Sequence, residues 1–421
     1  MRVVSEVVDA AVASTTSGDR LVVNAWRGGQ VLAADLDVTS FGLRWSASQQ
    51  IQGQASFTIA DPDGMLTPVG LGDALAPGGS RLQVTWVWGD ARVPAVPLGW
   101  WRIRRAKPAE QWRFYRPGGS EPRYGFGEGP FGIGPFGDVG APQAETLDGV
   151  AAGALLVYSG GEVVVDADEE TASIALARLD AEEVASSSSL DEVVRLLQSI
   201  CGVTNPFGVP DRSIPPGLVY EESRIDAIED HLDRLGAVHR MGGDGSLEIV
   251  PVGGVGPVWT IAGGDDGVLV ELQRELSDDQ LYNVAISTGE TEDGGQLRGR
   301  YALPGGPLDP SGPFGSVPIY HRSPATTAEG VQADARTLLE NRTAAGEVVM
   351  VITCLAHPGL QMHDVVTVAM PTTAGAQPLR GRVVGMALSS STGTPSKSMS
   401  LEVAVSAEAL EAVALRVRGV A

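Results

Sequence analysis

The most restrictive pattern in this sequence is a strict alternation of apolar and polar residues near its C-terminal end. Over residues 399–405 the apolar side chains share one parity and the polar ones the other, with Met399, Leu401, Val403 and Val405 set against Ser400 and Glu402. Successive side chains of a β-strand point to opposite faces, so this run predicts a strand with one buried face.

Three further strand-like runs precede it, at 348–355, 363–368 and 382–388. They are separated by clusters of Pro, Gly, Thr and Ser and recur every 10–15 residues or so, which favours a small antiparallel barrel or sandwich. No catalytic motif falls on these four runs. This part of the chain is therefore expected to be a scaffold.

The length of 421 residues is too great for one core and predicts several domains. The 54 glycines and 27 prolines favour many short strands over long helices. A first β region is expected over 20–105, where strand-like runs flank turns such as Arg27-Gly28-Gly29. Six of the eight tryptophans fall in this region and are interpreted as core and interface residues: Trp26, Trp45, Trp86, Trp88, Trp100 and Trp101.

Three helices are expected between the two β regions. The first begins with the capping box Ser189 to Glu192, and the second begins at Ser223 and ends before Gly236. The third begins at Thr326. A short strand is also expected at 162–166.

The fold class predicted from these patterns is β-rich α+β, with two small antiparallel β-barrels flanking a mixed α/β domain. The expected organisation is a first barrel (1–110), a Gly/Phe-rich insertion loop (111–155), an acidic mixed α/β domain (156–256), connecting strands and a helix (257–340), a second barrel (341–405) and a C-terminal tail (406–421).

The insertion repeats a short glycine and phenylalanine motif, first at 129–132 and again at 134–137. It also matches the glycine spacing of dinucleotide-binding proteins, but no strand precedes it and no helix follows it. We interpret it as a surface linker, or alternatively as an aromatic arm that orders against a neighbouring subunit.

A search for chemical sites yields no catalytic, cofactor-binding or metal-binding assignment. The two cysteines, Cys201 and Cys354, are too few for a cysteine-rich metal site and are expected to be buried apolar residues. No histidine pair has the helical spacing of a zinc site, and His231 is expected on or near the polar side of a helix; the five histidines are His231, His239, His321, His357 and His363.

Two acidic motifs could be mistaken for calcium loops. Residues 61–64, Asp-Pro-Asp-Gly, are interpreted as a tight turn, because all three residue types favour chain reversal. The carboxylates of Asp166, Asp168 and Glu170 lack the glycine that a calcium loop requires after them. A pair of carboxylates for glycan hydrolysis remains an open alternative among the 52 acidic residues.

The formal net charge of −22 is unevenly distributed. Residues 1–110 contain ten basic and ten acidic residues, whereas residues 146–256 contain six and twenty. Such an acidic field is expected to repel nucleic acid. Alternatively, the charge serves only to keep the protein soluble. The sequence starts without a signal-peptide pattern and has no apolar run long enough to cross a membrane, so synthesis in a cytoplasm is expected.

Two motifs resemble those of the tail-hub minor tail proteins of long-tailed bacteriophages. One is Leu98-Gly99-Trp100-Trp101-Arg102-Ile103, which closes the first β region. The other is Ala356-His357-Pro358-Gly359-Leu360, which leads into His363-Asp364-Val365-Val366, with His363 where relatives commonly have glycine. The resemblance covers about residues 20–405 apart from the insertion.

The resemblance implies a structural virion protein without enzymatic activity, a homotrimer whose paired barrels dock on a hexameric tail tube. It implies a place at the tail tip, with the tail tube or a distal tail protein on one side and tip, fibre or receptor-binding proteins on the other. DNA would pass through the ring without specific binding, and the protein would not insert into a membrane. The alternative is a tail-tip protein that binds or hydrolyses cell-wall glycans through acidic residues of the middle region.

Overall fold

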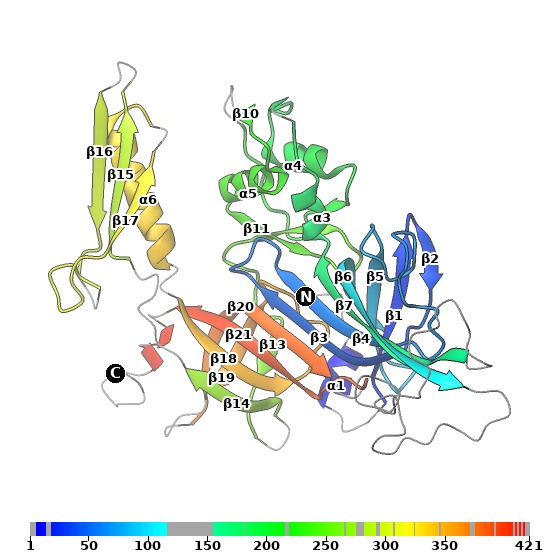
Figure 1. Ribbon diagram of the computed structural model, residues 1–421. Helices are drawn as coiled ribbons and strands as arrows, with labels where there is room; N and C mark the ends of the chain where they lie inside the picture. Colours follow the sequence, from blue (N-terminus) through cyan, green and yellow to red (C-terminus); the bar gives the residue numbers. More distant parts are fainter. Residues whose placement is uncertain are drawn as a thin grey trace, which may run out of the picture. The chain divides into compact units, whose positions relative to one another are not determined.

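A computed structural model gives the fold (Figure 1). It describes residues 6–13, 18–115, 155–180, 182–214, 219–264, 267–274, 282–291, 295–305, 308–323, 325–344, 347–370, 375–390, 393–406, 409–410, 412–413 and 416. The chain divides into two compact units. The first comprises Met1–Val252, Ala356–Leu360 and Ala387–Lys397, and the second comprises Gly253–Leu355, Gln361–Met386 and Ser398–Ala421.

The first unit is built on an antiparallel sheet with the strand order β3-β4-β7-β6-β5-β1-β2. Its strands are β1 (Arg20–Arg27), β2 (Gln30–Ala33), β3 (Val38–Ser46), β4 (Gly53–Ala60), β5 (Arg81–Val87), β6 (Val96–Tyr115) and β7 (Leu155–Glu169). Alternate residues of these strands form the core, and Phe57, Ile59 and Ile103 are fully buried. The short strand expected at 162–166 is part of β7, which lies between β4 and β6.

A bulge at Gly99 allows β6 to keep its apolar residues in the core. Val96 and Leu98 are buried on even positions, whereas Trp101 and Ile103 are buried on odd positions. The register against β5 shifts between Val84 and Thr85, opposite a Gly99 whose φ is 124°. Glycine adopts this backbone conformation readily, so the bulge inverts the parity without strain.

The rest of the first unit is a mixed α/β part. Its helices are α3 (Thr171–Leu176), α4 (Ser189–Leu197) and α5 (Arg224–Leu235), and its strands are β8 (Glu182–Glu183), β9 (Val203–Thr204), β10 (Val219–Tyr220), β11 (Ala237–Met241) and β12 (Leu247–Pro251). One stripe of α4 and one of α5 share a core that includes Val193, Leu196 and Ile228. The short helix α1 (Glu6–Ala13) also belongs to this unit and buries Val8 and Val12.

Capping residues explain where these helices begin and end. Ser223 accepts a hydrogen bond from the backbone N–H of Asp226, and Gly236 closes α5 with a φ of 67°, both as predicted. The cap of α4 is Ser188, one residue before the predicted position, and it accepts from the Asp191 N–H. These side chains satisfy N–H groups that have no partner inside the helix.

The second unit contains a sheet that includes the alternating strand at 399–405. Its strands are β13 (Trp259–Ile261), β14 (Leu269–Arg274), β18 (Glu347–Leu355), β19 (Val365–Met370), β20 (Gln377–Ser390) and β21 (Ser398–Ser406). The order is β14-β18-β21-β20, β19 pairs with β20 and β13, and residues 387–390 of β20 belong to the first unit. All four runs predicted as strands are strands, and Met399, Leu401, Val403 and Val405 are buried.

A smaller α/β element lies between β14 and β18 in the sequence. It consists of β15 (Val284–Glu290), β16 (Gln296–Ala302), β17 (Pro318–Arg322) and α6 (Ala328–Ala344), and the strand order is β16-β15-β17. Helix α6 covers one face of this sheet (Figure 1), where Ala285 packs against Ala335 and Leu339. Thr327, one residue after the predicted start, accepts from the Gly330 N–H.

The described part of the chain is thus β-rich, as predicted, and it contains a large antiparallel sheet and few helices. Most of the Gly/Phe-rich insertion and of the C-terminal tail lies outside the described residues. The ends of β6 and β7 extend into the predicted insertion and pair with each other as far as Tyr115 and Leu155.

Candidate functional site

A cavity of about 580 Å³ in the first unit brings aromatic and charged side chains together. Trp26 of β1 and Trp100 of β6 meet edge to face, with ring centroids 5.5 Å apart and an interplanar angle of 64°. The turn between β11 and β12 closes the cavity at Gly245, whose φ is 87°. A Cβ at this position would lie 2.9 Å from Trp100 Cδ1, so the turn needs a glycine to approach the indole.

The charged groups of this cavity balance one another. Glu170 is 2% exposed, and Arg81 Nη1 lies 3.1 Å from its Oε1. Burial raises the pKa of Glu170, while Arg81 and the nearby Ser173 hydroxyl oppose that rise. Arg27 and Asp244 also line the cavity, and they add one positive and one negative charge. A neutral polar molecule fits this lining better than an ion does.

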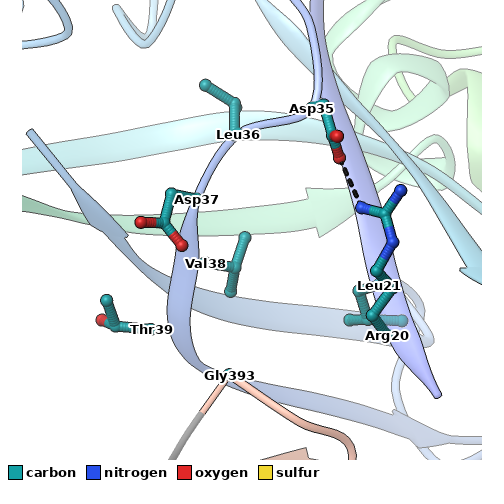
Figure 2. Close-up of a pocket in the computed structure, with 8 residues that line it drawn as sticks. All are labelled: Arg20, Leu21, Asp35, Leu36, Asp37, Val38, Thr39 and Gly393. Carbon is teal, nitrogen blue, oxygen red and sulfur yellow. Dashed lines mark hydrogen bonds and ion pairs between the residues drawn. The ribbon is translucent and has the colours of Figure 1, made fainter. Parts of the chain in front are cut away.

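A second, more open cavity of about 710 Å³ lies where β1 and the start of β3 meet the loop at Gly393 (Figure 2). Arg20 Nη1 lies 2.7 Å from Asp35 Oδ1, and both side chains are more than half exposed. Asp35 has a φ of 49°, and its backbone N–H donates to Asn24 Oδ1. Exposed pairs of this kind contribute about 0–1 kcal/mol and do not define a ligand.

The acidic turn at 61–64 is held together by its own carboxylate. Asp61 is fully buried and accepts hydrogen bonds from the Leu66 N–H at 3.0 Å and the Thr67 hydroxyl at 2.8 Å. Its oxygens are therefore used inside the loop, as the turn interpretation expects. Asp166 is likewise paired with Arg105, and its pKa is lowered: burial raises it, but the hydrogen bond and charge of Arg105 prevail. Within the described ranges, no group of three or more His, Cys, Asp or Glu residues is arranged to hold a metal ion.

The histidine-proline turn at 356–364 is buried along its whole length. The Gly359 N–H donates to His357 Nδ1 at 3.1 Å, so the imidazole is neutral and its Nε2–H donates to Asp9 Oδ1 at 2.9 Å. His363 has a φ of 65°, and its Nδ1 lies 3.1 Å from Arg382 Nη1. Glycine adopts this left-handed conformation more readily than histidine does, which gives a physical reason for the glycine that the resemblance leads us to expect at this position.

One histidine differs from its prediction. His231 was expected on or near the polar side of a helix, but it is fully buried in the core of the α/β part, where its Nε2 meets the Tyr220 hydroxyl. The same hydroxyl donates to Glu192 Oε1 at 3.0 Å. Its spacing could have revealed this burial, because His231 lies three residues after Ile228 and four before Leu235, on the apolar stripe of α5.

The sequence analysis assigned no site residues, and the Trp26–Trp100 cavity was not anticipated as a unit. Its tryptophans were interpreted as core and interface, and Trp45, Trp86, Trp88 and Trp101 are indeed buried. The signal that could have located it is the Asp-Gly turn at 244–245, which predicts a tight hairpin. Of the two cysteines, Cys354 is buried and Cys201 is half-buried, and burial raises the pKa of each thiol, to about 12 and about 11.

Comparison with known proteins identifies the fold. No protein-family model and no curated protein sequence matches the chain. Among solved structures, a tail protein from Neisseria meningitidis MC58 has a TM-score of 0.55 at 13% identity, over 91% of this chain and 96% of that one. The chain has the fold of a phage tail protein.

A second tail-protein structure agrees with the first. The 43 kDa tail protein of prophage MuSo2 from Shewanella oneidensis has a TM-score of 0.55 at 12% identity, over 93% of this chain and 99% of that one. The resemblance to phage tail proteins is therefore confirmed at the level of fold and over nearly the full length. In the part of the chain that the structure describes, no helix is both long and apolar enough to span a membrane.

Proposed function

We propose that this chain is a structural component of a phage tail, a homotrimeric hub at the tail tip that connects a hexameric tail tube to tip, fibre or receptor-binding proteins. The observation that carries the proposal is the likeness to two tail proteins over more than nine-tenths of every chain compared. A likeness of this extent covers the scaffold as a whole, whereas a shared single domain would not.

The trimer rests on the two β regions. In the proposal, residues 1–110 and 341–405 form similar barrel-like domains, and three copies of the pair present six related surfaces to the tube. The β-rich architecture and the exposed apolar residues on strand β2 (Val31, Leu32) and strand β14 (Val270) support this arrangement. Strand edges of this kind are common contact surfaces between subunits.

The role in DNA passage rests on charge. A ring at this position surrounds the exit path of the genome, and the net charge of −22 favours a lumen that repels DNA. The protein would be made in the host cytoplasm and assembled into the virion, without inserting into a membrane. In this proposal it has no catalytic role.

Two measurements test the hub. Sedimentation or native mass spectrometry of the purified chain should give the mass of a trimer, and electron microscopy of assembled tails should locate it at the tip. A monomer at all concentrations, or density along the tube shaft, would contradict the proposal. A basic lumen in the resolved ring would contradict the DNA-passage role alone.

A second candidate function is favoured by the Trp26–Trp100 cavity. Flat indoles beside a buried carboxyl and an arginine suit a neutral polyhydroxylated ligand, so this cavity could hold a saccharide of the cell wall. Glu170 and Asp244 come from the acidic middle region where the alternative function was expected. Calorimetric titration with soluble cell-wall fragments tests it, since Trp100→Ala should abolish binding. A wall-release assay on the same samples separates binding from hydrolysis.

A further inference from the structure

The sheet β16-β15-β17 has one face that α6 does not cover. The register pairs Arg298 with Thr288 and Thr288 with Arg322, which forms one row across the three strands. The next row consists of Arg300, Ile286 and Tyr320. Gly289 and Gly299, which have the opposite parity, touch Val331 of α6, so these two rows lie on the face away from the helix.

This open face is basic and accessible. Tyr320 is 71% exposed, the Arg322 side chain is 81% exposed, and Arg298 and Arg300 are also exposed. Ile286, between Arg300 and Tyr320, is buried beneath this surface. The one acidic neighbour recorded among these described side chains is Glu290, whose Oε1 lies 3.1 Å from Arg322 Nη2. Tyrosine and arginine around an apolar centre are the composition of an interface hot spot.

A complementary surface exists in the first unit, on helix α5. Asp226, Glu229, Asp230 and Asp233 follow the spacing i, i+3, i+4 and i+7, and so form one acidic stripe. Three of them are exposed and Glu229 is half-buried. Burial raises the pKa of Glu229, a hydrogen bond from the Gln50 amide opposes that rise, and the charges of the other three carboxylates add to it. Gln50 Nε2 also donates to Asp226 Oδ1 at 2.6 Å. The stripe therefore concentrates negative charge that a cationic partner would relieve.

The two surfaces also match in size. Strands β16 and β17 flank β15, so the Cα atoms of Arg298 and Arg322 are separated by two strand spacings, about 9.6 Å. The rise along a helix separates Asp226 from Asp233 by about 10.5 Å. A helix that crosses the strands at a steep angle can thus set its first and last carboxylates against these two arginines.

We propose that the open face of the β16-β15-β17 sheet, defined by Arg298, Arg300, Tyr320 and Arg322, binds the acidic stripe of α5 in a second copy of this chain. The contact joins two different surfaces, so each copy offers one of each, and such head-to-tail contacts close into a ring when the rotation between neighbouring copies closes. The inference rests on the proposed hub and names surfaces that hold its subunits together.

A second copy fits this face better than DNA does. Glu290 lies on the same face, and a single exposed tyrosine offers one stacking platform where strand binding uses several. The acidic partner is present on every copy at equal concentration. Binding to DNA is nevertheless a measurable outcome of the experiments below.

Cross-linking between distinguishable chains tests the contact directly. One chain carries Thr288→Cys, at the centre of the first row, and a mass-tagged chain carries Asp230→Cys, at the centre of the stripe. After mixing, a short thiol-specific cross-linker should join the two masses. Because burial raises the pKa of Cys201 and Cys354, the unmodified chains should give little product. Asp90→Cys, an acidic position outside the stripe, replaces Asp230→Cys as the matched control.

Charge reversal tests the chemistry of the same contact. Arg298→Asp with Arg300→Asp should raise the dissociation constant of the oligomer by about 30-fold or more, and should do so most at low salt. Adding Asp226→Arg and Asp230→Arg to that chain should restore assembly. Arg92→Asp with Arg178→Asp, at exposed positions of the first unit, should leave the mass unchanged. Circular dichroism confirms that every variant is folded.

The outcomes separate this inference from the proposed hub. A trimer that survives Arg298→Asp with Arg300→Asp, or that forms no cross-link between positions 288 and 230, overturns the inference and leaves the hub intact. A charge swap that fails to restore assembly also overturns it. If the double variant loses affinity for a DNA duplex while its mass is unchanged, the face binds nucleic acid instead. A wild-type chain that stays monomeric overturns both proposals.

Discussion

The strand pair β18–β21 and the α/β part built on α4 and α5 both bury apolar side chains, but they differ in what else they bury. In the strand pair, the core side chains are apolar or thiol groups, such as Ile352, Cys354 and Leu401. In the α/β part, the core also contains Glu192 and His231. The first region is held by apolar burial, and the second also depends on a connected set of hydrogen bonds.

The polar set in the α/β part is closely bonded. Arg195 Nη2 lies 2.7 Å from Glu192 Oε1, the Ser186 N–H donates to Glu192 Oε2 at 3.1 Å, and the Tyr220 hydroxyl joins Glu192 to His231. Burial raises the pKa of Glu192, but these donors outweigh it and hold the pKa at about 2. A buried carboxylate of this kind makes the region sensitive to pH, and no carboxylate is buried among the described side chains of β18 and β21.

The largest expected effect comes from placing one charge in the apolar core. Val403→Lys should lower the free energy of unfolding by more than about 4 kcal/mol, because Val403 is fully buried on β21. Val351→Lys is the matched control. It is half-buried and lies directly opposite Glu402, so it should change stability by less than about 1 kcal/mol. Denaturant unfolding measures both, and equal losses would contradict the assignment of the two faces.

The next effect comes from breaking the polar set. Glu192→Ala should cost about 3–5 kcal/mol, because it leaves the Arg195 guanidinium and the Tyr220 hydroxyl without their acceptor. Asp191→Ala, at an exposed position in the first turn of the same helix, should cost less than about 1 kcal/mol. A cost below 1 kcal/mol for Glu192→Ala would show that the hydrogen bonds add little to apolar packing.

Lowering the pH should destabilise the α/β part more than the strand pair, without any mutation. Complete burial lowers the pKa of His239 on β11 to about 4. As the pH falls below about 6.5, His239 therefore takes up a proton in the unfolded chain before it does so in the folded chain. Stability of the α/β part should therefore decline between pH 6.5 and 4 by up to about 3 kcal/mol, and should decline again below 4.5, where Glu192 stays ionised only in the folded chain.

Hydrogen exchange resolved by region measures this difference. Protection of β11 and α4 should fall across that range, whereas protection of β18 and β21 should fall less. His239→Phe should flatten the decline between pH 6.5 and 4. A decline of the same size in both regions would contradict a local origin in His239 and Glu192.

The smallest effect concerns the cap of α5. Ser223→Ala should cost about 1 kcal/mol, because the Asp226 N–H loses its acceptor, and Ser223→Gly only a few tenths. Thermal unfolding followed by helical circular dichroism measures both. Equal costs for Ala and Gly would indicate that the serine hydroxyl contributes no capping bond.

The contrast between the two regions also explains what the sequence could predict. Strand β21 was predictable because Met399, Leu401 and Val403 alternate with polar residues, and α5 because Ser223 and Gly236 mark its ends. These signals are local. The burial of His231 could have been predicted from its spacing to Ile228 and Leu235. Its pairing with Tyr220 and Glu192 could not, because these residues meet it only in the folded chain.

Long-range pairing limited the prediction of the larger sheet in the same way. Strand β7 was predicted as a short strand of the acidic α/β domain, but in the structure it pairs with β4 and β6. Strand β3 was missed although Phe41, Leu43 and Trp45 alternate along it, because Gly42 and Arg44 interrupt its strand propensity. The open face of β16-β15-β17 was equally hidden, since Arg298 and Arg322 share a face only through the register of three strands.

The close approach of Trp100 to Gly245 limits recombination between related genes. The two residues touch across 145 positions of sequence, and a side chain at position 245 would collide with the indole. A hybrid gene with its crossover between these codons would take the indole from one parent and the turn from the other. Such a hybrid folds only where the second parent also encodes glycine at the turn. This one contact therefore restricts which genes can exchange their 5′ segments and still encode a working protein.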